Sequence, residues 1–255
     1  MLRLLRNAKW AMSWSRLVGL VALLTLSPLA HAGPPYVSDD PETTDYHHVE
    51  AYLFASATST RFGTGSATGI DFSYGAGPDL QLTLVAPVAQ ERPNQGQSAT
   101  GPGNIELAAK IRLAHLARAG WDVSVFPRLF LPSASRRVGD QHEAYLLPVW
   151  IERDWGQWST FGGGGHVINH GGDSQDYTLL AWAITHQVLP RLQIGAEVFH
   201  RSADTREGVP STGLNAGVRF DFSDHYHLLG SIGPGIQNAS ATNEHSWYLA
   251  LLITR

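Results

Sequence analysis

Apolar and polar side chains alternate almost without interruption in two runs, residues 191–201 and residues 213–222. The apolar face of the first run holds Leu192, Ile194, Ala196 and Val198, and its polar face holds Gln193, Glu197 and Arg201. Successive side chains of a β-strand point to opposite faces, so each run predicts a strand with one apolar and one polar face. Full charges opposite an unbroken apolar face are typical of strands in a lipid-embedded barrel.

The same pattern recurs along the rest of the chain. About twelve strand-like runs follow one another, each near the ~9–11 residues that a tilted membrane-spanning strand needs. They are residues 47–58, 67–75, 79–86, 104–113, 121–131, 142–153, 157–168, 176–188, 191–201, 213–222, 226–232 and 246–254.

The connections between these runs fall into two alternating classes. The short ones are residues 76–78, 114–120, 154–156, 189–190 and 223–225. The long ones are residues 59–66, 87–103, 132–141, 169–175, 202–212 and 233–245. Short turns at one rim and long loops at the other are typical of an outer-membrane barrel whose turns face the periplasm. A soluble β-sandwich, the other all-β class that we considered, has no reason to sort its loops in this way. We therefore predict an antiparallel up-and-down transmembrane β-barrel, with both of its ends on the periplasmic side.

The beginning of the chain predicts export. Basic residues precede an apolar run at residues 17–26, and Ala30-His31-Ala32 follows as a small-x-small cleavage pattern. An uncleaved membrane anchor is the alternative, but the run is shorter than the ~20 apolar residues of a spanning helix. The predicted division is a signal peptide at residues 1–32, a Pro-rich acidic periplasmic lead-in at residues 33–46, and the barrel at residues 47–255.

Composition narrows the possible functions. The chain has no cysteine, a net charge of -4 and only 16% charged residues, with arginines scattered along it. Such a chain offers no basic field for nucleic acid. Several aromatic residues lie beside the short connections, where a membrane-interface girdle on the periplasmic side is expected. These residues are Tyr74, Trp121, Trp155, Trp158, Phe222 and Tyr226.

Polar residues on the inward face are the candidate lining of the lumen. They are Glu50, Tyr52, Asp71, Glu106, Lys110, Arg112, Arg128, Glu197, Arg201, Arg219 and Asp221. Charges that line a pore set which solutes pass, but a salt-bridge network that fills a narrow barrel is an equal alternative. On neighbouring strands, Glu197 is expected to pair with Arg219 or Arg201.

Two further features of the predicted strands, a set of inward-facing aromatic residues and a run of glycines, each have two interpretations. Tyr52, Phe54, Phe126 and Phe130 share the inward face, where they either line a path for an aromatic solute or pack inside the barrel. The glycine run at residues 162–165 either bends a strand so that a narrow barrel closes, or leaves space for a permeant.

No catalytic or metal site is predicted. His225 and His227 lie two apart, with Asp224 adjacent, but no spacing supplies a third and fourth metal ligand. An outer-membrane lipid hydrolase is the enzyme alternative, for which Ser202, Ser211 and His200 are close in sequence. No Gly-x-Ser-x-Gly turn accompanies them, and nothing fixes a base and its orienting partner. We expect no enzyme activity and no cofactor.

Several motifs resemble a known family. They are residues 33–42 (GPPYVSDDPE), 69–75 (GIDFSYG), 78–82 (PDLQL), 85–87 (VAP), 199–205 (FHRSADT) and 225–229 (HYHLL). Together they resemble the family of outer-membrane transporters named for the MetA pathway of phenol degradation. The resemblance implies an outer-membrane barrel and passage of small, aromatic compounds. The terminal Arg255 departs from the aromatic residue with which such barrels usually end.

The function expected from the sequence is passive uptake of small solutes, aromatic or hydrophobic ones among them. The expected partners are outer-membrane lipid, a small-molecule solute and the barrel assembly machinery, with no nucleic acid. A closed structural or interaction barrel that acts through its extracellular loops is the other candidate.

Overall fold

The structure is a computed structural model that describes residues 35–116 and 121–255. The predicted signal peptide at residues 1–32 lies outside the described residues, as do residues 33–34 of the lead-in. Within the described part of the chain, no helix is long and apolar enough to cross a membrane.

Nearly all of the described secondary structure is β-strand. The strands are β1 (Val49–Thr60), β2 (Gly63–Gly77), β3 (Leu80–Pro93), β4 (Ala99–Pro102), β5 (Glu106–Leu116), β6 (Trp121–Val125), β7 (Arg128–Phe130), β8 (Ala144–Trp155), β9 (Trp158–Asn169), β10 (Tyr177–Leu189), β11 (Leu192–Arg201), β12 (Ser211–Asp221), β13 (Tyr226–Gly233), β14 (Gly235–Gln237) and β15 (His245–Thr254). One short helix, α2 (Ala239–Thr242), lies between β14 and β15.

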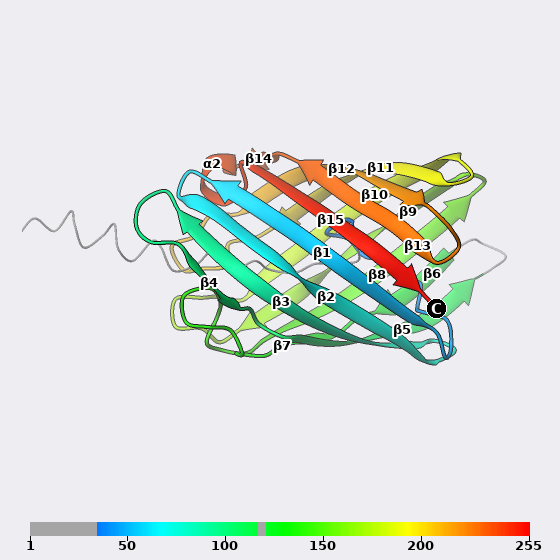
Figure 1. Cartoon of the computed structure of the whole chain (residues 1–255), viewed down its shortest axis with the longest axis horizontal. Coiled ribbons are helices and arrows are strands. Elements are labelled where there is room, and N and C mark those ends of the chain that lie inside the picture. The colour runs from blue at the N-terminus through cyan, green and yellow to red at the C-terminus, as the bar shows by residue number, and fades with distance from the viewer. Residues whose placement is uncertain (1–34, 117–120) are drawn as a thin grey trace, which may run out of the picture.

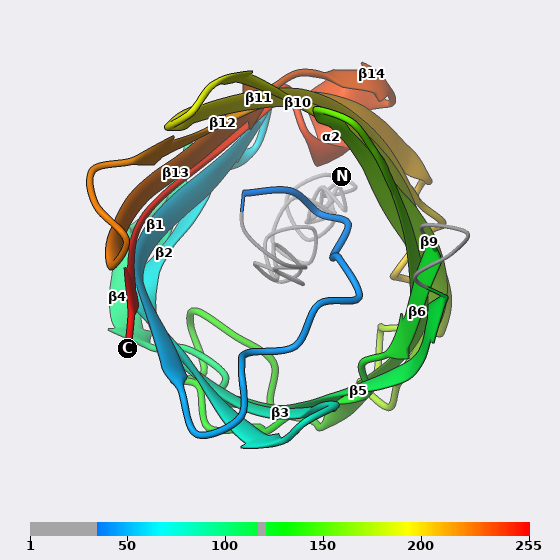
Figure 2. The ribbon, with the colours of Figure 1, turned by 90° about the vertical axis from the view of Figure 1, so that its right-hand side faces the viewer.

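The strands form one closed antiparallel barrel (Figures 1 and 2). The long strands pair in the order in which they follow one another along the chain, and β1 pairs with β15 to close the ring. The short strands β4 and β14 extend the pairing of β3 and β12, and β6 with β7 together form one position in the wall between β5 and β8. The barrel therefore has twelve strand positions, which confirms the predicted fold class.

Proline explains the one predicted strand that is divided. Residues 121–131 were expected to form a single strand, and the structure splits them at Phe126 and Pro127 into β6 and β7. Proline has no N–H to donate to the ladder, so it interrupts regular pairing. The carbonyl of Pro127 still accepts a bond from the N–H of Ala109 at 3.1 Å, which keeps the wall continuous.

The two rims of the barrel differ, but not at every predicted connection. The predicted long connection at residues 59–66 is wrong, because β1 and β2 extend toward each other and are joined by residues 61–62 alone. Residues 156–157 and 190–191 are the whole of two connections at one rim, which we call the turn side. Residues 131–143 and 202–210 are connections at the other rim, the loop side, where β4, β14 and α2 also lie (Figure 1).

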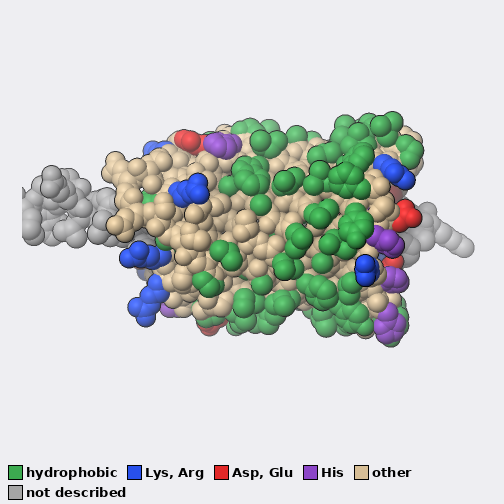
Figure 3. Space-filling view, viewed as in Figure 1, with side chains coloured by type: hydrophobic (Ala, Val, Ile, Leu, Met, Phe, Trp, Pro, Cys, Tyr) green, Lys and Arg blue, Asp and Glu red, His purple; other side chains and the backbone are tan. Residues whose placement is uncertain are grey.

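The outer face of the barrel is apolar. In β10, Leu180, Trp182 and Ile184 are exposed, whereas Leu179, Ala181 and Ala183 between them are buried. Hydrophobic side chains cover much of the face seen in Figure 3, while charged side chains and histidines lie near its two ends. So large an exposed apolar surface would be unfavourable in water but matches the hydrocarbon region of a bilayer. Of the predicted girdle residues, Trp155, Trp158, Phe222 and Tyr226 are exposed at the turn side.

The glycine run of β9 is needed for close approach by neighbouring strands. A Cβ on Gly163 would lie 2.1 Å from the carbonyl oxygen of Val149 and 3.2 Å from the ring of Trp150, and the residue has a φ of 150°. A Cβ on Gly165 would lie 2.9 Å from a methyl group of Leu146. Because Trp150 and Leu146 cover these glycines, the run leaves no space for a permeant there.

Candidate functional site

Residues 35–45 of the predicted lead-in lie inside the barrel (Figure 2). We keep the name lead-in for these residues. At its start, Ser231 of β13 donates a hydrogen bond to the carbonyl of Pro35. Towards its end, the backbone N–H of Thr44 donates to Oε1 of Gln81 on β3 at 2.8 Å. Strands β11 to β13 lie opposite β3 and β5 in the ring, so the lead-in crosses the lumen from one wall to the other.

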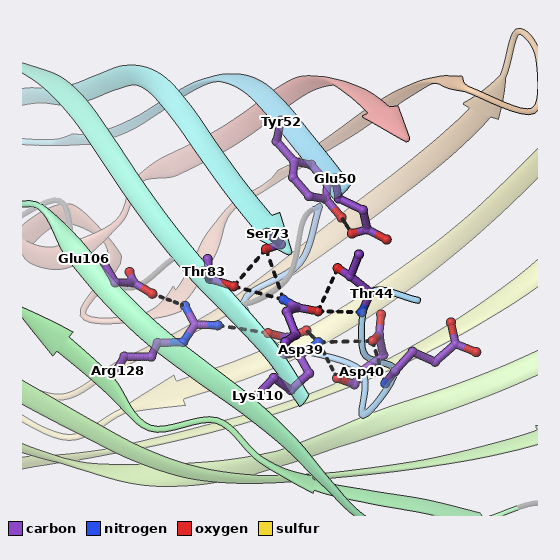
Figure 4. Close-up of polar contacts among 12 residues, drawn as sticks. Asp39, Asp40, Thr44, Glu50, Tyr52, Ser73, Thr83, Glu106, Lys110 and Arg128 are labelled. Carbon is purple, nitrogen blue, oxygen red and sulfur yellow. Dashed lines mark hydrogen bonds and ion pairs between the residues drawn. The ribbon is translucent and has the colours of Figure 1, made fainter. Parts of the chain in front are cut away.

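Asp39 anchors the middle of the lead-in. Its Oδ1 lies 2.9 Å from Nζ of Lys110 on β5, and its Oδ2 lies 2.9 Å from a guanidinium nitrogen of Arg128 on β7. Arg128 also meets Glu106 of β5 at 3.3 Å (Figure 4). All of these side chains are at most 7% exposed. Buried charges are tolerated only with partners, so removing any one of them would leave an uncompensated charge.

Glu197 of β11 holds the adjoining part of the lead-in. Its carboxylate accepts hydrogen bonds from the backbone N–H of Val37 at 3.0 Å and from that of Ser38 at 2.5 Å. The hydroxyl of Ser38 and the amide of Asn215 on β12 donate to it at 2.7 and 2.8 Å. Four donors around one carboxylate compensate the loss of water around a side chain that is 3% exposed.

Tyr36 fits against the wall at two glycines. A Cβ on Gly195 of β11 or on Gly217 of β12 would lie 2.3 or 2.5 Å from atoms of the Tyr36 side chain. The same ring packs edge-on against Phe161 of β9, with ring centroids 5.9 Å apart. Any larger residue at either glycine would displace the tyrosine, so these two positions are shaped to receive the lead-in.

The lumen near the loop side has a different lining. One cluster of buried residues, which we call the loop-side cluster, lies on β7 to β10, and Val37 of the lead-in packs against it. Its members are Phe130, Ala144, Leu146, Val167, Tyr177 and Leu179. A second cluster joins Phe54 and Tyr248 in stacked contact, with Tyr52 against it. The inward position predicted for Tyr52, Phe54, Phe126 and Phe130 is therefore observed, and packing accounts for Phe54 and Phe130.

The structure divides the predicted lining residues into groups. Glu106, Lys110, Arg128 and Glu197 surround the lead-in, directly or through one another. Glu50 accepts a hydrogen bond from the Tyr52 hydroxyl at 3.0 Å, and Asp71 lies on the adjacent strand in register with Tyr52. Three of the predicted arginines instead form ion pairs with nearby residues. Arg112 pairs with Asp79 at the turn side, Arg201 pairs with Asp204 at the loop side, and Arg219 pairs with Asp221 at 2.9 Å.

The predicted ion pair of Glu197 with Arg219 or Arg201 is wrong. In the observed register, Glu197 lies opposite Asn215, while Arg219 lies opposite Gln193 and Arg201 opposite Ser211. Arg219 is thus four residues along β12 from the position facing Glu197, and Arg201 is four residues from Glu197 on β11 itself. Arg219 turns to Asp221, which also contacts Nδ1 of His227 at 2.6 Å.

The candidate catalytic and metal-binding residues do not come together in one site. His200 hydrogen-bonds the hydroxyl of Thr212 at 2.8 Å, whereas Ser202 accepts from the N–H of Thr178 and Ser211 accepts from the hydroxyl of Thr242. Neither serine therefore pairs with His200. Among the described residues, no group of His, Cys, Asp and Glu is arranged to hold a metal ion.

Sequence reasoning missed the residues of the lead-in and their receptors on the wall. Asp39, Ser38, Tyr36, Gln81 and Asn215 are all needed for the contacts above. A signal was present, because an acidic lead-in precedes a barrel with buried basic positions at Lys110 and Arg128. What the sequence lacked was the pairing, since Asp39 and Arg128 are 89 residues apart.

A closed antiparallel barrel with an apolar outer face and charged side chains inside is the architecture of outer-membrane β-barrel proteins, and this chain has it. The COG4313 outer membrane channel from Pseudomonas putida F1 is similar, with a TM-score of 0.75 and 12% identity over 88% of this chain and 100% of that chain. The KdgM porin in complex with disordered oligogalacturonate has a TM-score of 0.56 and 9% identity over 79% and 98%. The NanC porin has a TM-score of 0.56 and 9% identity over 82% and 98%.

At such identities the likeness is one of fold. No family model and no curated protein matches the chain. The resemblance to the MetA-pathway family therefore stays a prediction.

Proposed function

We propose that the protein is an outer-membrane channel through which small solutes diffuse down their gradient. The observation that carries this proposal is the inner wall of the barrel. Its central positions are buried charges, namely Glu106, Lys110, Arg128 and Glu197, which are bridged by an irregular segment rather than by a regular apolar core. A polar barrel interior is the usual lining of an aqueous path through the outer membrane. The similar structures described above include a channel and two porins, which supports the same conclusion.

Aromatic or hydrophobic compounds are the solute class that we favour. The loop-side cluster, which includes the buried side chains of Phe130, Tyr177 and Leu146, makes the wall apolar near the rim at which a solute from outside would enter. Membership of the MetA-pathway family, which the sequence motifs suggest, agrees with such solutes. Export through a cleaved signal peptide and insertion by the barrel assembly machinery complete the proposal, with no cofactor and no catalytic step.

A closed barrel that acts through its loops is the second candidate. The observation that favours it is the lead-in, which crosses the lumen and binds both walls. If the lead-in stays bound, the long connections at residues 131–143 and 202–210 would carry the function instead.

Conductance separates these candidates. The folded barrel, verified by its heat-modifiable migration on a gel, is inserted in a planar bilayer and also in liposomes for swelling assays with phenol and with glucose. A channel of the proposed kind gives discrete current steps and admits phenol faster than glucose. A folded barrel that gives neither current nor swelling would refute the transport proposal and favour the interaction barrel.

A further inference from the structure

A cavity lies beside the lead-in at the turn side of the lumen. It has a volume of about 230 Å³. Its walls come from Pro35 to Glu42 of the lead-in and from strands β8 to β13. This volume is below the roughly 300 Å³ at which pockets for drug-sized ligands begin, so the cavity fits only a smaller molecule.

The lining of the cavity is strongly acidic. Asp40 and Glu42 of the lead-in face Glu152 and Asp154 of β8 across it. Arg219 is the only Lys or Arg in the lining, and its charge is already matched by Asp221 at 2.9 Å. The charge of Asp40 and, secondly, partial burial raise the pKa of Glu42 to about 7. A raised pKa is the direction expected for carboxylates brought close together, and it remains although Lys110, which lies 3.4 Å from Asp40, and Arg112 act in the opposite direction.

Two buried groups in the lining lack hydrogen-bond partners among the described residues. Glu152 is 8% exposed, and although its Oε1 accepts from the Ser159 hydroxyl at 2.6 Å, its Oε2 has no partner. Thr185 of β10 is 2% exposed, and its hydroxyl has no partner either. A buried polar atom without a partner is unfavourable, and a ligand with the matching donors would satisfy it.

We propose that this cavity binds a small primary ammonium compound. An ammonium group carries three N–H donors and a positive charge, so it satisfies Glu152 Oε2 and the Thr185 hydroxyl and neutralises the acidic lining. The edge-on pair of Tyr36 and Phe161 lines the same cavity and offers aromatic surface to the cation and to its carbon chain. Binding of the ammonium compound in the cavity does not depend on the proposed channel function. Transport of the same compound through the barrel does rest on that function.

A matched set of ligands tests the inference. Butan-1-amine, butan-1-ol and butanoate have the same carbon chain with a positive, a neutral and a negative head group. Each is titrated by calorimetry into the folded full-length barrel in detergent. We expect binding of the amine, with the alcohol and the acid at least about tenfold weaker, because a hydrogen bond to a charged group is stronger than one between neutral groups.

Three variants locate the site. Glu152→Gln removes the charge at constant shape, and Thr185→Val removes the hydroxyl at constant shape, so each is expected to weaken the amine about tenfold. Glu91→Gln is the matched control, because Glu91 is a half-buried carboxylate of β3 that does not line the cavity. We expect Glu91→Gln to bind the amine as the unaltered protein does.

The outcomes distinguish this inference from the proposed function. Amine binding that is no stronger than alcohol binding, or that persists in both Glu152→Gln and Thr185→Val, would overturn the cavity as an ammonium site even if the barrel conducts. Selective binding that is lost in these variants upholds the site even if no current is found in a bilayer, in which case only the transport proposal fails.

Discussion

Two regions of the inner wall are built in opposite ways. In the apolar loop-side cluster, from Phe130 to Leu179, the wall is covered by its own side chains. Around Lys110, Arg128 and Glu197 the wall presents charged groups, and a separate segment of the chain supplies their partners. The first region depends on hydrophobic packing between neighbouring strands, and the second on ion pairs between groups far apart in sequence.

The difference shows that the wall and the segment inside it depend on different interactions. Packing of adjacent strands is lost only when the barrel itself unfolds. The lead-in, in contrast, is held by a few buried charges and hydrogen bonds, so a substitution that breaks them is expected to loosen it while the ladder of β1 to β15 stays intact. The predictions below test this division.

Substituting Asp39 has the largest expected effect. Asp39→Ala leaves Lys110 and Arg128 without their shared carboxylate, and breaking a buried ion pair costs roughly 3–5 kcal/mol. Amide hydrogen exchange in residues 36–44 is therefore expected to rise about a hundredfold or more, with exchange in the strands unchanged. Asp45→Ala, at an exposed position of the same segment, is the control and is expected to leave exchange unaltered. Equal exchange in both variants would show that Asp39 does not hold the lead-in.

Truncating a side chain of the loop-side cluster tests the apolar region of the wall. Leu146 is fully buried, and Leu146→Ala is expected to lower the free energy of unfolding by roughly 2–5 kcal/mol through lost contacts and a cavity. Denaturant titration in lipid vesicles measures this loss. Exchange around Asp39 is expected to change little in the same variant. If Leu146→Ala loosened the lead-in but did not destabilise the barrel, that result would contradict the division between the two regions.

A change of pH should alter the acidic cavity through Glu42. Its pKa of about 7 means that the carboxyl is neutral below that pH and negative above it, beside Asp40, Asp154, Lys110 and Arg112. Because this pKa is raised on folding, the bound lead-in is favoured by the protonated form, and that contribution is lost as pH rises through 7. Cation preference, read from the reversal potential in a salt gradient, should increase from about pH 6 to about pH 8. Glu42→Gln should flatten this response, and an unchanged response would place the titrating group elsewhere.

The smallest expected effect concerns Glu197 and Arg219. Since Arg219 is paired with Asp221, a double-mutant cycle of Glu197→Gln and Arg219→Gln should show a coupling energy below about 0.5 kcal/mol. The same cycle with Glu197→Gln and Asn215→Ala should show about 1–3 kcal/mol, because those groups share a hydrogen bond. A large coupling in the first cycle would contradict the observed register.

The sequence was sufficient to predict the strands of the barrel wall but not the contacts of the lead-in that crosses the lumen. Alternation along residues 191–201 and 213–222, with the sorting of connection lengths, predicted the strands, their faces and the two rims, because each of these depends on neighbours in the chain. The lead-in has no periodicity, and its contacts join Ser38 to Glu197 and Thr44 to Gln81 over long separations. Even within the wall, the residue opposite Glu197 could not be known, since the pattern of faces is unchanged by a shift of two residues.

The measurement that tests the account most directly is the single-channel conductance of the barrel with and without residues 35–45, each refolded and inserted in the same bilayer. The lead-in crosses a narrow lumen. The account therefore predicts small current steps for the full-length barrel and severalfold larger ones for the shortened form, with unchanged heat-modifiable migration. Equal conductance in the two forms would contradict the claim that the lead-in obstructs a conducting path.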